Sequence, residues 1–177
     1  MTRPVHSLVL AAGTALLVLG CSPGGAGQAT APAPAAAAPP TASPAPATPA
    51  GPRAEGEAYQ VALELPATAK AGEAAAARVV VTARGPYHVN RDYPMAFRPD
   101  AESTARFPGE RVPLGEGAVR TACAAFPGED CSVSAPLAFT AVVPGATRLS
   151  GTVAFSVCNP DRCLIEKVPL AATVDAR

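Results

Sequence analysis

The sequence predicts an all-β fold, an antiparallel β-sandwich that follows an N-terminal leader and a disordered tether rich in proline and alanine. Two observations support this prediction. The composition changes near Glu55, and the roughly 120 residues from there to Arg177 hold all the tyrosine and phenylalanine and nearly all the charge, which indicates one domain, residues 55–177. Within this domain, alternating and β-branched runs are separated by proline and glycine turn signals at intervals that suit a sandwich.

Residues 1–20 have the features of an export signal. Arg3 and His6 precede an apolar run of about 12 residues, which is shorter than the roughly 18 residues of a membrane-spanning helix. The run ends in Val-Leu-Gly-Cys, which resembles the lipobox of bacterial lipoproteins. By that resemblance Cys21 carries the lipid, and Ser22 after it favours the outer membrane if the bacterium is Gram-negative. An ordinary secretory signal that is cleaved elsewhere is the alternative.

Residues 21–54 form the predicted tether. Positions 22–52 contain nine prolines and no charged or aromatic residue. Such a segment buries too little apolar surface to offset the entropy lost on ordering it. The prolines favour an extended chain and prevent the alanines from propagating a helix. The tether is therefore expected to hold the domain away from the membrane.

The charge balance argues against nucleic acid as a partner. The whole chain has 14 basic and 14 acidic residues, and removal of the leader takes away only Arg3, which leaves a net charge of about −1. The lysines and arginines are scattered along the sequence, whereas a nucleic-acid-binding protein needs a basic patch.

The strands follow from the sequence pattern. Residues 59–65 (YQVALEL) and 135–143 (APLAFTAVV) alternate apolar and polar side chains, as strands with one buried face do. Residues 78–84 (RVVVTAR) form a β-branched run. The alanines of residues 72–80 favour a helix, but they lead directly into that run, so a strand is predicted there too. Residues 98–100 and 106–111, within a loop region at 91–116, are predicted to form a long polar loop.

The last two strands, 147–157 and 164–174, are predicted to form a hairpin around the four-residue loop Asn-Pro-Asp-Arg. Each arm places its larger apolar side chains on one face, and Cys158 and Cys163 fall on the other. A loop of this length sets the two cysteines opposite each other. The Cα atoms of a non-hydrogen-bonded pair then lie about 4.5 Å apart, within reach of a disulfide. Glu166 departs from the pattern, since it falls on the apolar face.

Four cysteines remain if Cys21 is lipidated. An even number in an exported chain favours disulfides, and the simplest of the three pairings joins Cys123 to Cys131 and Cys158 to Cys163. Zinc is the rival ligand. Paired cysteines of structural zinc sites usually have roughly two to four residues between them, whereas Cys123 and Cys131 have seven.

The Cys158/Cys163 pair has two interpretations. As a structural disulfide it closes a very short loop. The chain-entropy model then assigns it only about 2 kcal/mol of stabilisation of the folded domain. An outward-facing bond with Arg162 beside Cys163 suits thiol–disulfide exchange, because a neighbouring positive charge favours the thiolate. Many exported sandwiches nevertheless have local hairpin disulfides that take part in no chemistry.

The segment LSGTVAFSVCNPDRCLIEKVPL, together with the Gly-Pro-Tyr-His-Val-Asn element at 85–90, resembles the N-terminal periplasmic domain of DsbD-type thiol:disulfide interchange proteins. The resemblance covers about residues 58–175, and only the Cys-x4-Cys hairpin is specific. It implies an immunoglobulin-like sandwich in which Cys158 and Cys163 are a redox pair that reduces periplasmic partner proteins.

The same resemblance implies an aromatic cap over the disulfide, for which Tyr93, Phe97 and Phe107 are the candidates. The pair Cys123 and Cys131 lies outside the family pattern and is interpreted as structural. The sequence shows neither the membrane-embedded electron conduit nor the thioredoxin-like domain of the full transporter. Electrons would therefore have to be exchanged with a separate thioredoxin-like protein in the periplasm.

Other chemistries have little support in the sequence. A Ser-His-Asp triad would depend on His88, the only histidine after the leader, and no nucleophile motif accompanies it. Copper would need several histidine or methionine ligands, but only His88 and Met95 follow the leader. Asp92 and Glu102 are interpreted as solvated loop charges. No metal or cofactor is predicted.

Two functions are consistent with the sequence. In the first, the protein is a lipid-anchored binding or envelope-structural module whose disulfides are local staples. In the second, it is a thiol–disulfide exchange protein that uses Cys158 and Cys163 with a periplasmic redox partner. The sequence leaves open whether the protein is an enzyme.

Overall fold

The computed structural model describes residues 51–177, and these residues form strands and loops without a helix. The all-β prediction is confirmed. The leader at 1–20, Cys21 and the tether up to residue 50 lie outside the described residues. The strands are β1 (Arg53–Glu55), β2 (Tyr59–Glu64), β3 (Ala74–Ala83), β4 (His88–Val89), β5 (Ala96–Pro99), β6 (Ala105–Arg106), β7 (Val112–Pro113), β8 (Val119–Ala122), β9 (Asp130–Ala141), β10 (Gly145–Cys158) and β11 (Cys163–Ala176).

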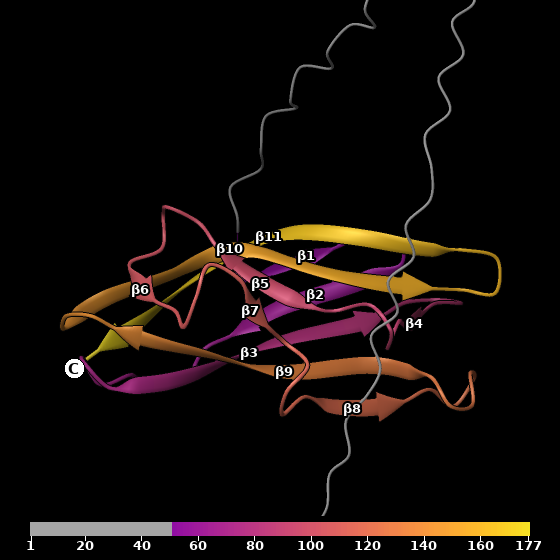
Figure 1. The fold of residues 1–177 in the computed structure, drawn as a ribbon, viewed down its shortest axis with the longest axis horizontal. Helices are drawn as coiled ribbons and strands as arrows, with labels where there is room; N and C mark the ends of the chain where they lie inside the picture. The colour runs from indigo at the N-terminus through magenta and orange to yellow at the C-terminus, as the bar shows by residue number, and fades with distance from the viewer. Residues whose placement is uncertain (1–50) are drawn as a thin grey trace, which may run out of the picture. The chain divides into compact units, whose positions relative to one another are not determined.

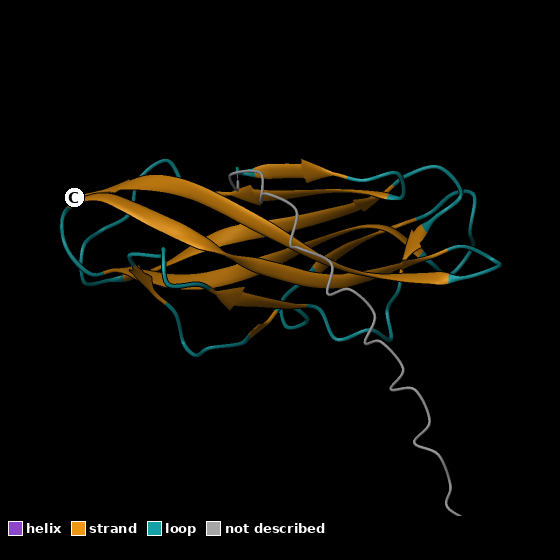
Figure 2. Cartoon of the chain, turned by 90° about the horizontal axis from the view of Figure 1, so that it is seen from above, coloured by secondary structure: helices purple, strands orange, loops and turns teal. Residues whose placement is uncertain are grey.

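Hydrogen bonds link these strands into one antiparallel sheet with the order β1-β2-β3-β9-β4-β10-β5-β7, and β11 pairs with β10 while β6 and β8 pair with β9. The sheet folds into two layers, with β10 and β11 on one side and β3 and β9 on the other (Figure 1). The long strands of both layers can be followed from above in Figure 2. The short strand β4 joins the layers, since it pairs with both β9 and β10. This two-layer arrangement is that of an immunoglobulin-like sandwich.

The core lies between the two layers. Side chains from β2 and β3 meet side chains from β10, and the rings of Tyr59 and Phe155 pack edge to face with their centroids 5.0 Å apart. The largest fully buried side chains come from both layers: Phe97, Phe139, Phe155, Leu114, Leu137, Leu149, Leu170, Val61, Val79, Val81, Val89 and Val133. Apolar burial of this kind is the main stabilising contribution to a domain of this size.

The long strands lie where their patterns predict them. The alanine-rich segment before Val79 is part of β3 and not a helix. Its alternate residues Ala77, Val79 and Val81 are buried, and β2 and β9 pair with β3 on either side. Pairing on both edges and burial of one face therefore outweigh the helix propensity of alanine. The first strand begins at Arg53, two residues before the predicted start of the domain.

The prediction of a long polar loop in the region 91–116 is wrong in part. Three short strands, β5, β6 and β7, lie within it, and Phe97 of β5 is fully buried. β5 pairs with β10, where Gly151 allows the close approach: a Cβ atom there would clash with the Arg98 carbonyl oxygen and the Phe97 ring. The segments are too short to show a period, and their pairing with distant strands is not visible in the sequence.

Candidate functional site

The candidate site lies at the loop end of the β10–β11 hairpin. The two strands pair along their whole length, Cys158 stands opposite Cys163, and a disulfide joins them with the Cα atoms 4.0 Å apart. The loop is closed by Asn159, whose N–H donates to the Arg162 carbonyl oxygen (2.9 Å). Its side-chain oxygen accepts the N–H groups of Asp161 (3.0 Å) and Arg162 (2.9 Å). The Asn-Pro-Asp-Arg sequence is thus an Asx-type turn that sets the register of the hairpin.

The two sulfur-bearing residues have different environments. Cys163 is exposed, as expected, but Cys158 is only 6 % exposed. Both cysteines lie on the outer face of the hairpin, as predicted, but the expectation that the bond is exposed is wrong for Cys158. Strand β4 pairs along the other edge of β10 and places His88 directly opposite Cys158. Of the two residues in the disulfide, Cys163 is therefore accessible to a partner in solution, and Cys158 is shielded.

His88 connects the disulfide to a neighbouring loop. Its Nε2 lies 3.6 Å from a carboxylate oxygen of Glu129, and its ring centroid lies 5.8 Å from that of Phe126. Its Nδ1 is buried and has no hydrogen-bond partner within residues 51–177. An open pocket of about 450 Å³ runs along this side of the disulfide and is lined by His88, Asn90, Arg91, Asp92, Glu129, Cys158, Asn159 and Cys163. The histidine predicted to be a loop or strand-end residue therefore lies beside the cysteine pair.

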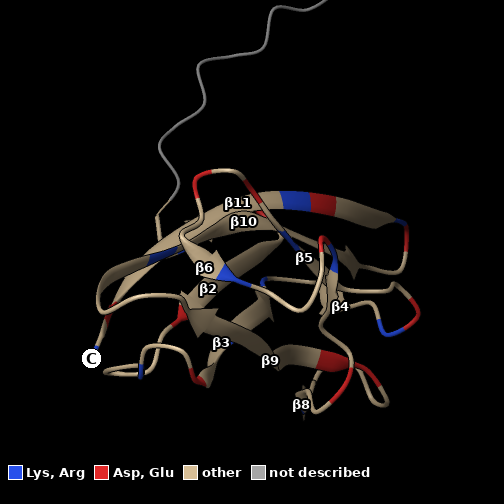
Figure 3. Ribbon diagram, turned by 60° about the vertical axis from the view of Figure 1, so that its left-hand side comes forward, with Lys and Arg blue, Asp and Glu red and all other residues tan. Residues whose placement is uncertain are grey.

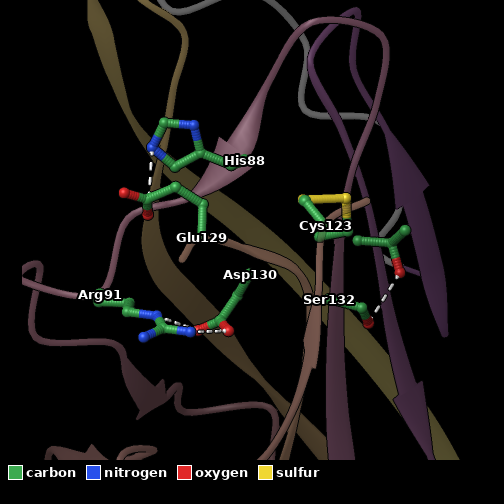
Figure 4. Close-up of a disulfide and its surroundings, with 8 residues drawn as sticks. His88, Arg91, Cys123, Glu129, Asp130 and Ser132 are labelled. Carbon is green, nitrogen blue, oxygen red and sulfur yellow. Dashed lines mark hydrogen bonds and ion pairs between the residues drawn. A yellow bond between two sulfur atoms is a disulfide. The ribbon is translucent and has the colours of Figure 1, made fainter. Parts of the chain in front are cut away.

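The second disulfide braces the loop that contacts His88. Cys123 and Cys131 are joined, with their Cα atoms 4.7 Å apart, so both predicted pairings are present. Inside the closed loop the Cys123 N–H donates to the Glu129 carbonyl oxygen (2.8 Å) and the Glu129 N–H donates to that of Phe126 (3.0 Å). Figure 4 shows the Cys123 disulfide in the same neighbourhood as His88 and Glu129. That the two cysteine pairs lie at the same end of the domain could not be predicted from their positions in the chain.

A buried ion-pair cluster fixes the base of this region. Asp130 is 1 % exposed, and its carboxylate accepts hydrogen bonds from the Arg91 Nε (2.9 Å) and Nη2 and from the Arg120 Nη1 (2.8 Å). Burial raises the pKa of Asp130, but the hydrogen bonds and charges of the two guanidinium groups outweigh it, so the pKa lies below its ordinary value. The cluster ties Arg91, which follows β4, and Arg120 of β8 to the start of β9. Figure 4 shows the Arg91–Asp130 pair. Sequence reasoning did not find this cluster.

Arg162, the cation expected beside Cys163, is oriented by an aromatic residue. Its Nη2 donates to the hydroxyl of Tyr87 (3.3 Å), and Tyr87 itself is 7 % exposed. This hydrogen bond is the main reason that the pKa of Arg162 is raised. The guanidinium of Arg162 therefore lies against Tyr87, although Arg162 directly precedes Cys163 in the chain.

The three candidates for an aromatic cap do not cover the disulfide. Phe97 is a core residue and packs against the partly buried Phe107, with the ring centroids 5.3 Å apart. Tyr93 lines two pockets elsewhere. The expectation of a cap from these residues is therefore wrong. The aromatic residues near the site are Phe126, against His88, and Tyr87, against Arg162.

The remaining candidates have ordinary surroundings. Met95 is buried in the core, and Glu102 forms an exposed ion pair with Arg148 at 3.2 Å. Asp92 lines the disulfide pocket. Basic and acidic residues are interspersed over the domain (Figure 3). Within the described part of the chain, no group of three or more His, Cys, Asp or Glu side chains is placed to hold a metal ion.

Comparisons of the chain with protein-family models, with curated proteins and with solved structures found no match. Two disulfides are typical of proteins in an oxidising, exported compartment. Among residues 51–177 there is no helix with the length and apolar character needed to cross a membrane.

Proposed function

We propose that this protein is an exported, lipid-anchored thiol–disulfide exchange protein. In this proposal Cys21 carries the lipid, and the DsbD-like domain exchanges its Cys158–Cys163 bond with a thioredoxin-like protein of the envelope. The observation that carries the proposal is the asymmetry of the pair: an exposed Cys163, a shielded Cys158 and an open pocket beside them. Ser22 after the lipidated cysteine favours the outer membrane of a Gram-negative cell.

The exposure of the two cysteines orders the exchange steps. A thiolate of the partner bonds to the Cys163 sulfur, and the Cys158–Cys163 bond breaks, which leaves Cys158 as a thiolate that takes up a proton. The second thiolate of the partner then attacks the partner's own sulfur in the mixed disulfide and releases Cys163. Two electrons pass from the partner dithiol to this domain. The reverse sequence reduces a partner disulfide and begins with the Cys163 thiolate.

Two neighbouring groups assist this chemistry. The imidazole of His88 lies on the strand paired with Cys158 and lines the same pocket, where its ring can stabilise the departing thiolate. Arg162 carries its charge on the residue before Cys163 and is oriented by Tyr87. Both groups favour the thiolate forms on which exchange depends.

A trapping experiment tests the proposal. In Cys158→Ala the exposed Cys163 thiol has no internal partner, so we expect a stable mixed disulfide with a thioredoxin-like envelope protein that has a Cys-x2-Cys motif. The matched control is Cys163→Ala, which leaves only the shielded Cys158 and should trap at least about tenfold less, because exchange rate depends on access to the thiol. Equal trapping by both variants, or none by either, would contradict the proposed order of attack.

A second candidate function is a binding or envelope-structural module in which the bond is a staple. The observation in its favour is that Cys158 is buried and that three hydrogen bonds already close the Asn159–Arg162 turn. The reduction potential separates the two candidates. A value below about −300 mV, with no exchange against a thioredoxin-like protein, is typical of structural disulfides and would favour the module.

A further inference from the structure

A second pocket lies on the outer face of β10, and we call it the outer groove. Its volume is about 540 Å³. Thr152 and Ala154 of β10 form its floor, and the side chains around them are Tyr93, Arg98, Arg111 and Lys167, with Pro99 and Asp100 at one end. It shares no lining residue with the disulfide pocket.

Strand register places two of the basic side chains on either side of the floor. Arg98 of β5 pairs with Thr152, and Lys167 of β11 pairs with Ala154. Residues that face each other across antiparallel strands project from the same side of the sheet. Thr152 and Ala154 project from one side because they are two residues apart. Arg98 and Lys167 therefore rise from the two strands that flank a floor of small side chains.

The groove has an excess of positive charge. Within residues 51–177 Arg98, Arg111 and Lys167 form no ion pair, and Arg111 only donates to the Pro94 carbonyl oxygen (3.2 Å). The single carboxylate, Asp100, already accepts hydrogen bonds from the Ser150 hydroxyl (2.7 Å) and the Glu102 N–H (3.0 Å). The groove therefore has three positive side chains and one negative side chain, which leaves an excess of two positive charges.

We propose that the outer groove binds an organic phosphate. A phosphate monoester carries about −1.5 to −2 charges at neutral pH, which matches the excess in the groove, whereas a single carboxylate would leave one cation unpaired. Arginine is suited to phosphate because its planar guanidinium donates two parallel hydrogen bonds. The volume falls in the range of small-molecule sites, about 300–1,000 Å³, and exceeds the needs of one phosphate group. Tyr93, Pro99 and Ala154 provide the surface for the organic part.

Calorimetric titration of the full chain with phenyl phosphate tests this site. We expect saturable binding that Arg98→Gln and Lys167→Gln each weaken about five- to tenfold, since each removes one charge-assisted contact. Benzoate, which has the ring but one negative charge, should bind more weakly than phenyl phosphate. Lys70→Gln is the matched control, because Lys70 is 75 % exposed and does not line the groove.

One further measurement identifies the source of the phosphate. Co-sedimentation with phosphatidylcholine vesicles, with and without phosphatidic acid, shows whether a lipid headgroup or a free phosphate ester is preferred. An increase in vesicle binding that depends on phosphatidic acid and that Arg98→Gln abolishes supports the site with a lipid ligand. Absence of binding to both probes, or an equal loss in Lys70→Gln and Arg98→Gln, would overturn the proposal. Because these variants leave the cysteines unchanged, the outcome is independent of the trapping experiment.

Discussion

At the scale of single residues, Asp130 shows how a buried charge is retained in this domain. A carboxylate removed from water is costly unless it is paired and hydrogen-bonded. Arg91 and Arg120 supply both conditions from different segments, and their own side chains stay 47 % and 34 % exposed. The cluster therefore fixes the start of β9, next to the loop that contacts His88.

Replacing this carboxylate should destabilise the domain. We expect Asp130→Asn to lower the free energy of unfolding by about 2 to 3 kcal/mol, somewhat less than the 3 to 5 of a fully buried pair because the arginines are partly solvated. Urea denaturation measures the change. The exposed Asp161→Asn is the control and should shift it by less than about 0.5 kcal/mol. Similar losses in both variants would contradict the role given to the cluster.

The same residue predicts a dependence of stability on pH. The folded pKa of Asp130 lies below its ordinary value of 3.8, so its contribution is complete above that value and is lost as the pH falls through the folded pKa. The stability difference between the wild type and Asp130→Asn should therefore be constant near neutral pH and shrink below about pH 4. A difference that stays constant through acid unfolding would argue against a lowered pKa.

At the scale of elements, the contact between β5 and β10 depends on one glycine. Gly151 faces the Arg98 carbonyl oxygen and the Phe97 ring, and neither can move without displacing a sheet partner or a buried side chain. Because β5 also carries Arg98 into the outer groove, this close approach helps to shape that site.

Adding a single methyl group tests the element contact. We expect Gly151→Ala to lower the free energy of unfolding by about 2 kcal/mol, since overpacking forces the strands apart. Gly115→Ala is the matched control, because a Cβ there meets no atom within 4 Å. Thermal and urea unfolding measure both variants. If Gly151→Ala were as stable as Gly115→Ala, the two strands would have to be less tightly packed than the structure shows.

At the scale of the whole molecule, the two layers are held together by side chains from one face of the terminal hairpin. Phe155 points into the core against Tyr59, while Ile165 of the same hairpin is 63 % exposed. The pKa of Tyr59 is raised, mainly because burial removes its hydroxyl from water. The negative charge of Glu166 adds to this effect. The hairpin thus has one structural face and one face that carries the disulfide and the outer groove.

Substitutions on the two faces should differ in how strongly they lower the free energy of unfolding. Phe155→Leu should cost about 1 to 2 kcal/mol of unfolding free energy through lost volume and the lost edge-to-face contact with Tyr59. Ile165→Ala should change it by less than about 0.5 kcal/mol, because the side chain is already in water. Chemical denaturation distinguishes them, and a larger loss in Ile165→Ala would show that the inward face had been assigned to the wrong side.

Local sequence alone predicted the long strands, the register of the terminal hairpin and, as the simplest of three possibilities, both cysteine pairings. These features depend on residues close in the chain, where a period of two and a four-residue turn are readable. Tertiary structure alone decided the burial of Cys158 by His88, the Asp130 cluster, the short strands at 96–113 and the outer groove. Each of these joins segments far apart in sequence, and the sequence does not show which distant strands will pair.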